Sequence, residues 1–261
     1  MVVDDTKLQK LLSDPAKPLT PKDLRRDGNV FMVGGELPAQ ETLETLFDSH
    51  CLAPAELFHL SFGAPDTFSN GETLARLIKR NFSAHILGKM DYPASAPILE
   101  RVYAAGVDII DIPLTSFDRT DRESRLASLQ SAQAIFPRWT VVSTLVLGEE
   151  PLEATLTEIG HLLARGIVPL LHLPSQTNRC GIEDATAAYT KLATEWRTFK
   201  VTVAPLLPFI ALTTPFVQPK QGGALRGFMD RMRDRRLLAA SDFRRALRVR
   251  QVEESFESAG L

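Results

Sequence analysis

Residues 105–114, AGVDIIDIPL, decide the fold that this sequence predicts. A helical stretch at residues 97–105 precedes them, with apolar residues at spacings of three and four, and Gly106 separates this stretch from the apolar run that follows. Glycine suits the left-handed residue that ends a helix. A second junction of the same kind, Arg165-Gly166-Ile167, follows the helical stretch at residues 154–165. Both junctions indicate a helix that leads directly into a buried strand.

Apolar runs of this kind recur at intervals of about 30 residues, which is the length of one strand-helix-strand unit. Parallel strands need such long crossover connections, because a tight turn cannot join them. The seven predicted strands cover residues 29–33, 57–62, 84–88, 107–114, 140–147, 167–173 and 201–207. We therefore predict an α/β fold of the TIM-barrel-like (βα)n type. The barrel is expected to be partial or open, unless one end of the chain supplies an eighth strand.

The segments that flank this barrel differ from it in composition. Residues 1–28 mix charges with prolines, and Thr20-Pro21 places a capping residue before a proline at a first helical position. This pattern predicts a lead-in arm or a short helix. The barrel domain is expected over residues 29–212. A linker and a basic, amphipathic helical tail are expected over residues 213–261, where arginines are interleaved with apolar residues.

Two interpretations of the arginine-rich C-terminal tail remain open. Its helices either pack on the barrel and leave their arginines in solvent, or dock on a protein partner through residues 223–250. Nucleic acid is not expected as a partner, because the basic residues lack the interleaved aromatic side chains on which bases stack. A net charge of −2 also gives the whole chain no field that would attract nucleic acid or a membrane surface.

The cysteines and the first residues bear on where the protein is found. Cys51 and Cys180 are too few for a disulfide framework or a cysteine-only metal cage, which predicts reduced thiols. Residues 1–10 are polar and charged, and no run of about 20 apolar residues occurs in the chain. We therefore predict a cytoplasmic protein without a transmembrane segment.

Residues 142–149, VSTLVLGE, place Gly148 and Glu149 directly after an apolar strand. Together with residues 105–114 and the approach to the next strand at residues 163–169, this segment resembles the core of radical S-adenosylmethionine (SAM) enzymes of the biotin-synthase-like kind. The resemblance implies that Gly148 and Glu149 lie beside the adenine and ribose of SAM. Gly34-Gly35-Glu36 is similar to the family's Gly-Gly-Glu, which grips the amino group of SAM, although there it follows the second strand.

One motif that this family requires is missing. A radical SAM enzyme holds its four-iron cluster through a Cys-x3-Cys-x2-Cys loop after the first strand, since three thiolates fix three irons and leave the fourth for SAM. Residues 34–40 follow the first predicted strand without a cysteine, and only Cys51 lies nearby. The resemblance therefore implies a degenerate barrel that holds no four-iron cluster by itself. We expect an accessory or non-catalytic subunit with a residual pocket for SAM or another small molecule.

Glycines and polar residues at the carboxyl ends of the predicted strands are the candidate ligand-binding residues, because βα barrels place their sites there. They are Gly34, Gly35, Glu36, Ser61, Lys89, Asp111, Thr115, Gly148, Glu149 and His172. The sequence assigns none of them a catalytic role. It also assigns no metal site, because neither a His-x-His pair nor a His-Glu-x-x-His helix is present.

Two ordinary barrel enzymes remain as alternatives to an accessory subunit. His172, Asp111, either His59 or His85, and a glutamate could ligate a divalent cation in a metal-dependent lyase or hydrolase. Lys89 closes a predicted strand and could form a Schiff base in an aldolase. A third alternative is a protein-interaction module that docks through the basic tail.

Overall fold

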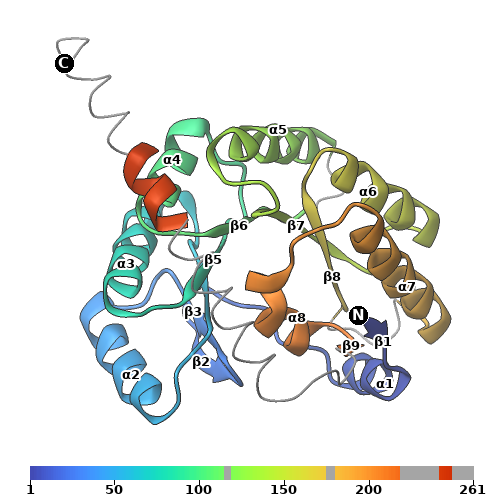
Figure 1. The fold of residues 1–261 in the computed structure, drawn as a ribbon, viewed down its shortest axis with the longest axis horizontal. Coiled ribbons are helices and arrows are strands. Elements are labelled where there is room, and N and C mark those ends of the chain that lie inside the picture. Colours follow the sequence, from blue (N-terminus) through green and yellow to red (C-terminus); the bar gives the residue numbers. More distant parts are fainter. Residues whose placement is uncertain (115–118, 175–179, 218–240, 249–261) are drawn as a thin grey trace.

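The computed structural model describes residues 1–114, 119–174, 180–217 and 241–248, so most of the predicted tail lies outside the described residues. The fold is α/β, with a seven-stranded, mostly parallel sheet flanked by helices (Figure 1). Across the sheet the strands are β2 (Leu24–Asp27), β3 (Val30–Val33), β4 (Leu57–Ser61), β5 (His85–Lys89), β6 (Ile109–Asp111), β7 (Val141–Val146) and β8 (Val168–His172). The main helices are α1 (Asp5–Ser13), α2 (Ala39–Leu52), α3 (Phe68–Asn81), α4 (Ala96–Ala104), α5 (Arg119–Ile135), α6 (Leu152–Ala164), α7 (Ile182–Thr198) and α8 (Leu207–Thr213).

Strands β3 to β8 are all parallel, and a helix lies between each strand and the next. The first six predicted apolar runs are therefore confirmed as strands. β2 runs antiparallel to β3 with Asp27 opposite Val30, so Gly28 and Asn29 form a two-residue hairpin loop. Gly28 has a φ of 59°, a left-handed conformation that glycine adopts readily. In the described part of the chain no pairing joins β2 to β8, and these strands form the two edges of the sheet.

Two predictions about local structure are wrong. Residues 201–207, predicted as a seventh strand, form a 3-10 helix, η2 (Ala204–Leu206), that leads into α8. The reason is proline: Pro205 and Pro208 lack the amide donor that a central strand needs, and both suit the first turn of a helix. Residues 1–28, predicted as a lead-in arm or a short helix, do contain the helix α1, but no helix begins at Thr20-Pro21, where the chain turns into β2.

A second, two-stranded sheet connects the ends of the described domain. β1 (Val2–Val3) pairs antiparallel with β9 (Phe216–Val217), which follows α8. The Phe216 ring packs between Tyr189 and Trp196 of α7, at centroid distances of 5.6 and 5.5 Å. The N-terminal segment, predicted as a lead-in arm or a short helix, is thus fixed to the outer layer of helices.

One face of the main sheet is covered by α2 to α7 and carries aromatic core contacts (Figure 1). The rings of Phe31 and Phe58 stack with centroids 5.3 Å apart, and Phe82, just after α3, contacts Phe58 at 5.1 Å. Alternate residues of a strand face opposite sides. His59 therefore points to the other side, which we call the inner face, where Phe209 of α8 contacts its ring at 4.8 Å.

The helix-to-strand junctions have the predicted geometry. Gly106 ends α4 with a φ of 113°, and the N–H of Val107 donates to the carbonyl of Val102 at 3.4 Å. Gly166 ends α6 with a φ of 79° and the same pattern of backbone hydrogen bonds. Both are Schellman closures, which satisfy the last carbonyls of a helix and turn the chain into the next strand.

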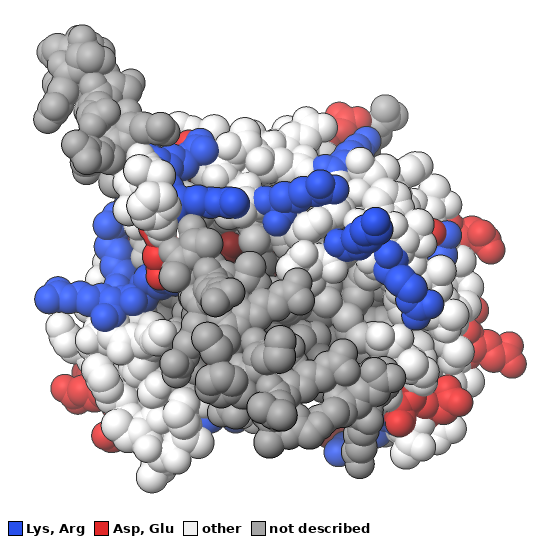
Figure 2. All heavy atoms as spheres, viewed as in Figure 1, with Lys and Arg blue, Asp and Glu red and all other residues white. Residues whose placement is uncertain are grey.

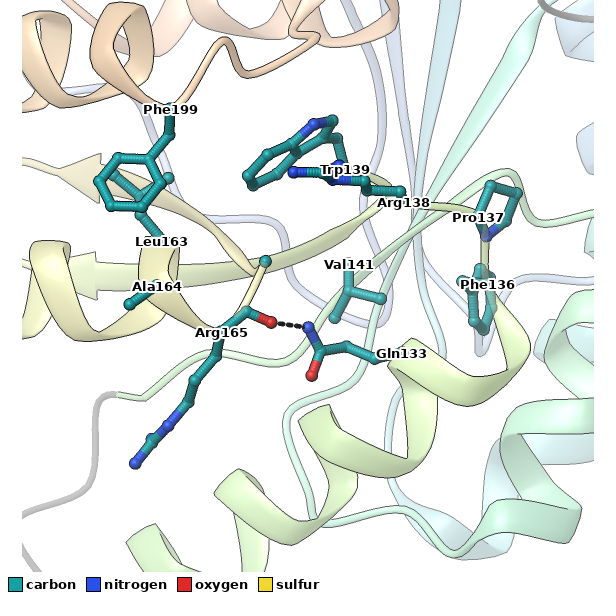
Figure 3. A pocket seen from close by; sticks show the side chains of 11 residues that line it. Gln133, Phe136, Pro137, Arg138, Trp139, Val141, Leu163, Ala164, Arg165 and Phe199 are labelled. Atoms are coloured by element: carbon teal, nitrogen blue, oxygen red, sulfur yellow. Dashed lines mark hydrogen bonds between the residues drawn. The ribbon is translucent and has the colours of Figure 1, made fainter.

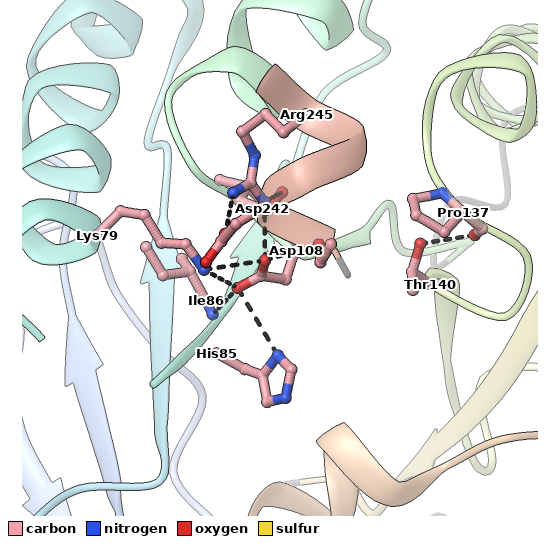
Figure 4. A network of polar contacts seen from close by, with 10 residues as sticks. Lys79, His85, Ile86, Asp108, Pro137, Thr140, Asp242 and Arg245 are labelled. Atoms are coloured by element: carbon pink, nitrogen blue, oxygen red, sulfur yellow. Dashed lines mark hydrogen bonds and ion pairs between the residues drawn. The ribbon is translucent and has the colours of Figure 1, made fainter. Parts of the chain in front are cut away.

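A helix over residues 241–248 lies against the amino ends of β5 and β6 (Figure 4). Its Arg245 donates to Asp108 just before β6, and its Arg248 donates to Glu100 of α4. Two arginines of the predicted tail are therefore held by acidic residues of the domain. Residues 218–240 and 249–261, which carry the rest of the tail prediction, lie outside the described ranges. None of the helices in the described ranges is long and apolar enough to cross a bilayer.

Candidate functional site

Three predicted site residues are register partners on neighbouring strands. Ser61 ends β4 opposite Lys89, which ends β5, and Lys89 lies opposite Asp111, which ends β6. Alternation from His59 places all three on the inner face of the sheet. His172 ends β8 and has the same orientation by register through β7. We call Ser61, Lys89, Asp111 and His172 the inner-face site.

Asp111 is buried and is held in one orientation by Thr144 of β7. The backbone N–H of Thr144 donates to Oδ1 at 3.0 Å, and its hydroxyl donates to Oδ2 at 2.7 Å. Burial raises the pKa of Asp111 to about 6, although the Thr144 hydrogen bonds and the positive charge of Lys89 limit the rise. A carboxyl group with such a pKa can take up and release a proton near neutral pH.

Lys89 is the positively charged residue of the inner-face site, and its charge acts on several neighbouring groups. Its Nζ is 2.8 Å from Oδ1 of Asp91, a side chain that is half exposed. The positive charge of Lys89 contributes to the pKa values of Asp111, His59 and His172, so these groups lie within electrostatic reach of its ammonium. Burial is the larger cause for both histidines, and it lowers their pKa values. The two imidazoles are therefore neutral hydrogen-bonding groups at pH 7.

His59, one of the alternative metal ligands, has a further property in the structure. It is 5% exposed, and neither of its ring nitrogens has a hydrogen-bond partner among the described residues. Burial, together with the positive charges of Lys89 and Arg25, lowers its pKa to about 3. A buried imidazole without partners is uncommon, because the lost hydration is normally replaced by hydrogen bonds. His59 therefore extends the polar lining of the inner face toward α8.

The Gly34-Gly35 pair is explained by close backbone contacts. A Cβ atom on Gly34 would lie 2.1 Å from the carbonyl oxygen of Pro21, and one on Gly35 would lie 2.3 Å from that of Ser61. The N–H groups of Gly34 and Glu36 donate to backbone carbonyls at 2.7 and 2.9 Å. These two N–H groups are thus used within the chain, while the Glu36 side chain is exposed.

Gly148 and Glu149 follow β7, directly after Leu147, whose N–H donates to the carbonyl of His172 at 2.9 Å. They line a cavity of about 310 Å³ between the β7–α6 loop and the start of α7, together with Cys180 and Asp184. Gly148 has a φ of 79°, so glycine is needed for this turn. Burial, followed by the negative charge of Asp184, raises the pKa of the Cys180 thiol, which keeps it protonated and unreactive.

The remaining site predictions concern Thr115 and metal ligation. Thr115 lies outside the described residues. Within the described ranges, no three His, Cys, Asp or Glu side chains are grouped as a metal ion would require. His85 begins β5, whereas His172 ends β8, so the two histidines lie at opposite ends of the sheet. The described residues therefore do not assemble the mixed histidine and carboxylate site considered above.

Comparison of the chain with protein-family models, curated proteins and solved structures finds no match. The resemblance to radical SAM enzymes therefore depends on the sequence motifs alone. The inner-face site is interpreted below from its own chemistry.

Proposed function

We propose that this chain is a partial (βα)n barrel of the radical-SAM-like kind that has no cluster and binds a small zwitterionic molecule at the inner-face site as an accessory subunit. One observation carries the proposal: Ser61, Lys89 and Asp111 are adjacent in register at the carboxyl ends of three parallel strands. This is the end at which βα folds bind their ligands.

Lys89 is the residue that we assign to an anionic group of the ligand. Its present partner, Asp91, is half exposed and can be exchanged for a ligand carboxylate at small cost, because exposed ion pairs contribute little free energy. Asp111, with a pKa of about 6, is mostly ionised at pH 7 and complements a ligand ammonium. The neutral imidazole of His172 adds a hydrogen-bonding group without adding charge.

An amino-acid head group, such as that of SAM, combines the carboxylate and the ammonium that Lys89 and Asp111 would bind. The residues present therefore fit this part of SAM. They do not fit the cluster, because Cys51 lies in α2 and Cys180 precedes α7, and two thiolates cannot replace three. SAM bound by this chain alone would remain intact.

Calorimetry with SAM tests the site. We expect binding to the full chain and a loss of about 10- to 100-fold in affinity in Lys89→Met, the range for a hydrogen bond to a charged group. Lys191→Met is the matched control, because Lys191 also pairs with a carboxylate, Glu195 at 2.6 Å, but lies on α7. Absence of binding at millimolar SAM would remove SAM as the ligand. Equal affinity of the two variants would remove Lys89 from the site.

Iron analysis tests the absence of the cluster. The protein is purified without oxygen, reconstituted with iron and sulfide, and examined by iron content and visible absorption. We expect no stoichiometric iron. A four-iron cluster in the reconstituted protein would overturn the proposal.

A Schiff-base aldolase is the second candidate, and the proximity of Lys89 to Asp111 favours it. A lysine beside a carboxyl group with a pKa of about 6 combines a nucleophile with an acid-base group. The Lys89–Asp91 ion pair opposes this candidate, because it stabilises the ammonium, which is not nucleophilic. Borohydride trapping with small aldehydes decides: a stable adduct in the wild type that is absent from Lys89→Met would establish the lysine chemistry.

Docking of the arginine-rich tail on a protein partner remains part of the proposal. Arg245 and Arg248 are engaged with acidic residues of the domain, so the proposal concerns the other arginines of residues 223–250. Arg226, Arg231 and Arg233 lie outside the described residues, and the test replaces all three with glutamine. We expect these substitutions to weaken a copurifying partner without lowering the melting temperature, whereas an unchanged complex would contradict the docking role.

A further inference from the structure

Two neighbouring cavities lie at the amino ends of the strands, opposite to the inner-face site. The larger, of about 490 Å³, lies between the ends of α5, α6 and α7 and the start of β7 (Figure 3). The smaller, of about 200 Å³, lies beside the helix over residues 241–248. Pro137, Arg138 and Trp139 line both. The larger volume is within the range of small-molecule sites in proteins.

The shared wall is a four-residue turn with an unusual residue at its corner. The N–H of Thr140 donates to the carbonyl of Pro137 at 3.2 Å, which closes a turn with Arg138 and Trp139 as its central residues. Trp139 has a φ of 67°. Turns that need a positive φ at this position normally use glycine, and a bulky residue there is a genuine outlier. Backbone strain of this kind is concentrated at functional sites, and Trp139 lines both cavities.

The lining of the two cavities combines flat aromatic surfaces with positive charge. The Arg138 guanidinium lies over the Trp139 ring at 4.7 Å, and the Phe199 side chain lines the same larger cavity (Figure 3). Arg165 also lines the larger cavity, and Arg244 lines the smaller. On the visible face of the molecule, Lys and Arg side chains gather between the helix over residues 241–248 and the side of α6 and α7. Asp and Glu lie mostly toward the rim of this face (Figure 2).

Negative charge that could compensate these arginines is scarce in the lining. No Asp or Glu is among the residues described as lining the larger cavity. Asp108 lines the smaller one, but its carboxylate already accepts from Lys79, Arg245 and the backbone N–H of Ile86. Among the described residues the guanidinium groups of the lining have no ion-pair partner, so a ligand with an anionic group would be attracted to them and a cationic ligand would be repelled.

We propose that these cavities form a second binding site, for a nucleoside monophosphate. The base would stack between Trp139 and Phe199, since every base offers a flat face to an aromatic ring. The phosphate would pair with Arg138, whose planar guanidinium binds phosphate oxygens in pairs. The ligand therefore needs both a planar ring and a phosphate. A nucleoside alone would leave Arg138 unused, and a phosphate alone would leave the aromatic side chains unused.

Intrinsic fluorescence provides a direct test, because the chain has two tryptophans and Trp196 is buried in α7. In the Trp196→Phe variant all tryptophan emission comes from Trp139. Adenosine 5′-monophosphate is expected to quench this emission saturably. Adenosine and inorganic phosphate are each expected to bind at least tenfold more weakly. No saturable quenching at millimolar nucleotide would overturn the proposal, and so would equal affinity for adenosine and its monophosphate.

Substitutions in the same background locate the site. Arg138→Gln is expected to weaken the monophosphate at least tenfold and to leave adenosine unchanged. Arg76→Gln is the matched control, because Arg76 is an exposed, ion-paired arginine of α3. Trp139→Gly removes the indole, and glycine adopts the positive φ of this position without strain. We expect this variant to lose binding of the monophosphate, as measured by calorimetry. Retained affinity in both Arg138→Gln and Trp139→Gly would contradict the site.

Discussion

Nη2 of Arg245 lies 2.7 Å from Oδ1 of Asp108, although 137 residues separate the two along the chain (Figure 4). Both side chains are buried, and Nζ of Lys79 lies 3.1 Å from each oxygen of the same carboxylate. Asp108 also accepts the backbone N–H of Ile86 at 3.0 Å. The carboxylate thus connects α3, β5 and the helix over residues 241–248 at the amino ends of the strands.

Arg245→Met is expected to lower the free energy of unfolding by about 3 kcal/mol, because removal of one partner leaves a buried charge with fewer compensating groups. Arg248→Met on the same helix is the control. Its ion pair with Glu100 is about one-third exposed, so a loss below about 1 kcal/mol is expected. Urea unfolding measures both. Equal losses would show that the helix, rather than the buried pair, accounts for the stability.

Acid should destabilise the fold through the ion pairs of Asp108 with Lys79 and Arg245. Burial raises the pKa of Asp108, but the hydrogen bond from His85 and the charges of Lys79 and Arg245 outweigh it and hold the pKa well below its ordinary value. A carboxyl group with a lowered folded-state pKa stabilises the fold above its unfolded pKa, and this stabilisation is lost as the pH falls. Stability of the wild type should therefore decline below about pH 4, and the decline should be shallower in Asp108→Asn.

Asp111 should have the opposite effect on stability. Its folded-state pKa is raised to about 6, so the unfolded chain releases this proton at lower pH than the folded protein does. The wild type should lose about 2 kcal/mol of unfolding free energy between pH 4 and pH 7 through this group. Asp111→Asn keeps the shape and cannot ionise; its amide oxygen can accept from the Thr144 N–H, while its NH2 group can donate to the Thr144 hydroxyl. The free energy of unfolding of the variant, measured at both pH values, should therefore rise relative to that of the wild type between pH 4 and pH 7. A difference between the two proteins that does not change with pH would contradict the raised pKa of Asp111.

Much of the sheet was predictable because its signals are local. The apolar runs predict β3 to β8, and Gly106 and Gly166 mark the junctions where α4 and α6 end. β2 is not predicted from the sequence, because residues 24–27 carry two arginines and have no apolar run; a Gly-Asn pair between two strands is the local signal that could have found the hairpin. Residues 201–207 are apolar enough for a strand, but their prolines favour a helix.

The site was predictable only in part, because its contacts join distant segments. Strand-end position identifies Lys89 and Asp111 from sequence, since the carboxyl ends of parallel strands meet at one edge. The register that makes them neighbours depends on how the strands pack. The hydrogen bonds from Thr144 to Asp111 span 33 residues, and no local pattern predicts them. The aromatic cavity at Trp139 likewise depends on Phe199, which a different helix supplies.

Gly35→Ala tests whether the glycine pair serves the fold. The new Cβ would lie 2.3 Å from the carbonyl oxygen of Ser61, so we expect a loss of about 1–3 kcal/mol in unfolding free energy. Gly160→Ala is the matched control within α6, where nothing lies within 4 Å of the added Cβ. Its free energy of unfolding should rise by about 1 kcal/mol, because alanine favours a helix over glycine. A stable Gly35→Ala protein with weakened SAM binding would instead assign Gly35 to the ligand.

Lys200 closes α7 in the way that Gly106 and Gly166 close α4 and α6. Its φ is 53°, and the N–H of the next residue, Val201, donates to the carbonyl of Trp196 at 2.9 Å. A lysine in this left-handed conformation is strained, because its Cβ approaches the following carbonyl. Lys200→Gly should therefore gain about 1 kcal/mol, or about 2–4 °C in melting temperature by calorimetry. Lys200→Ala retains the Cβ and should gain nothing. If both variants gained equally, the lysine charge, and not its backbone, would be the source of the strain.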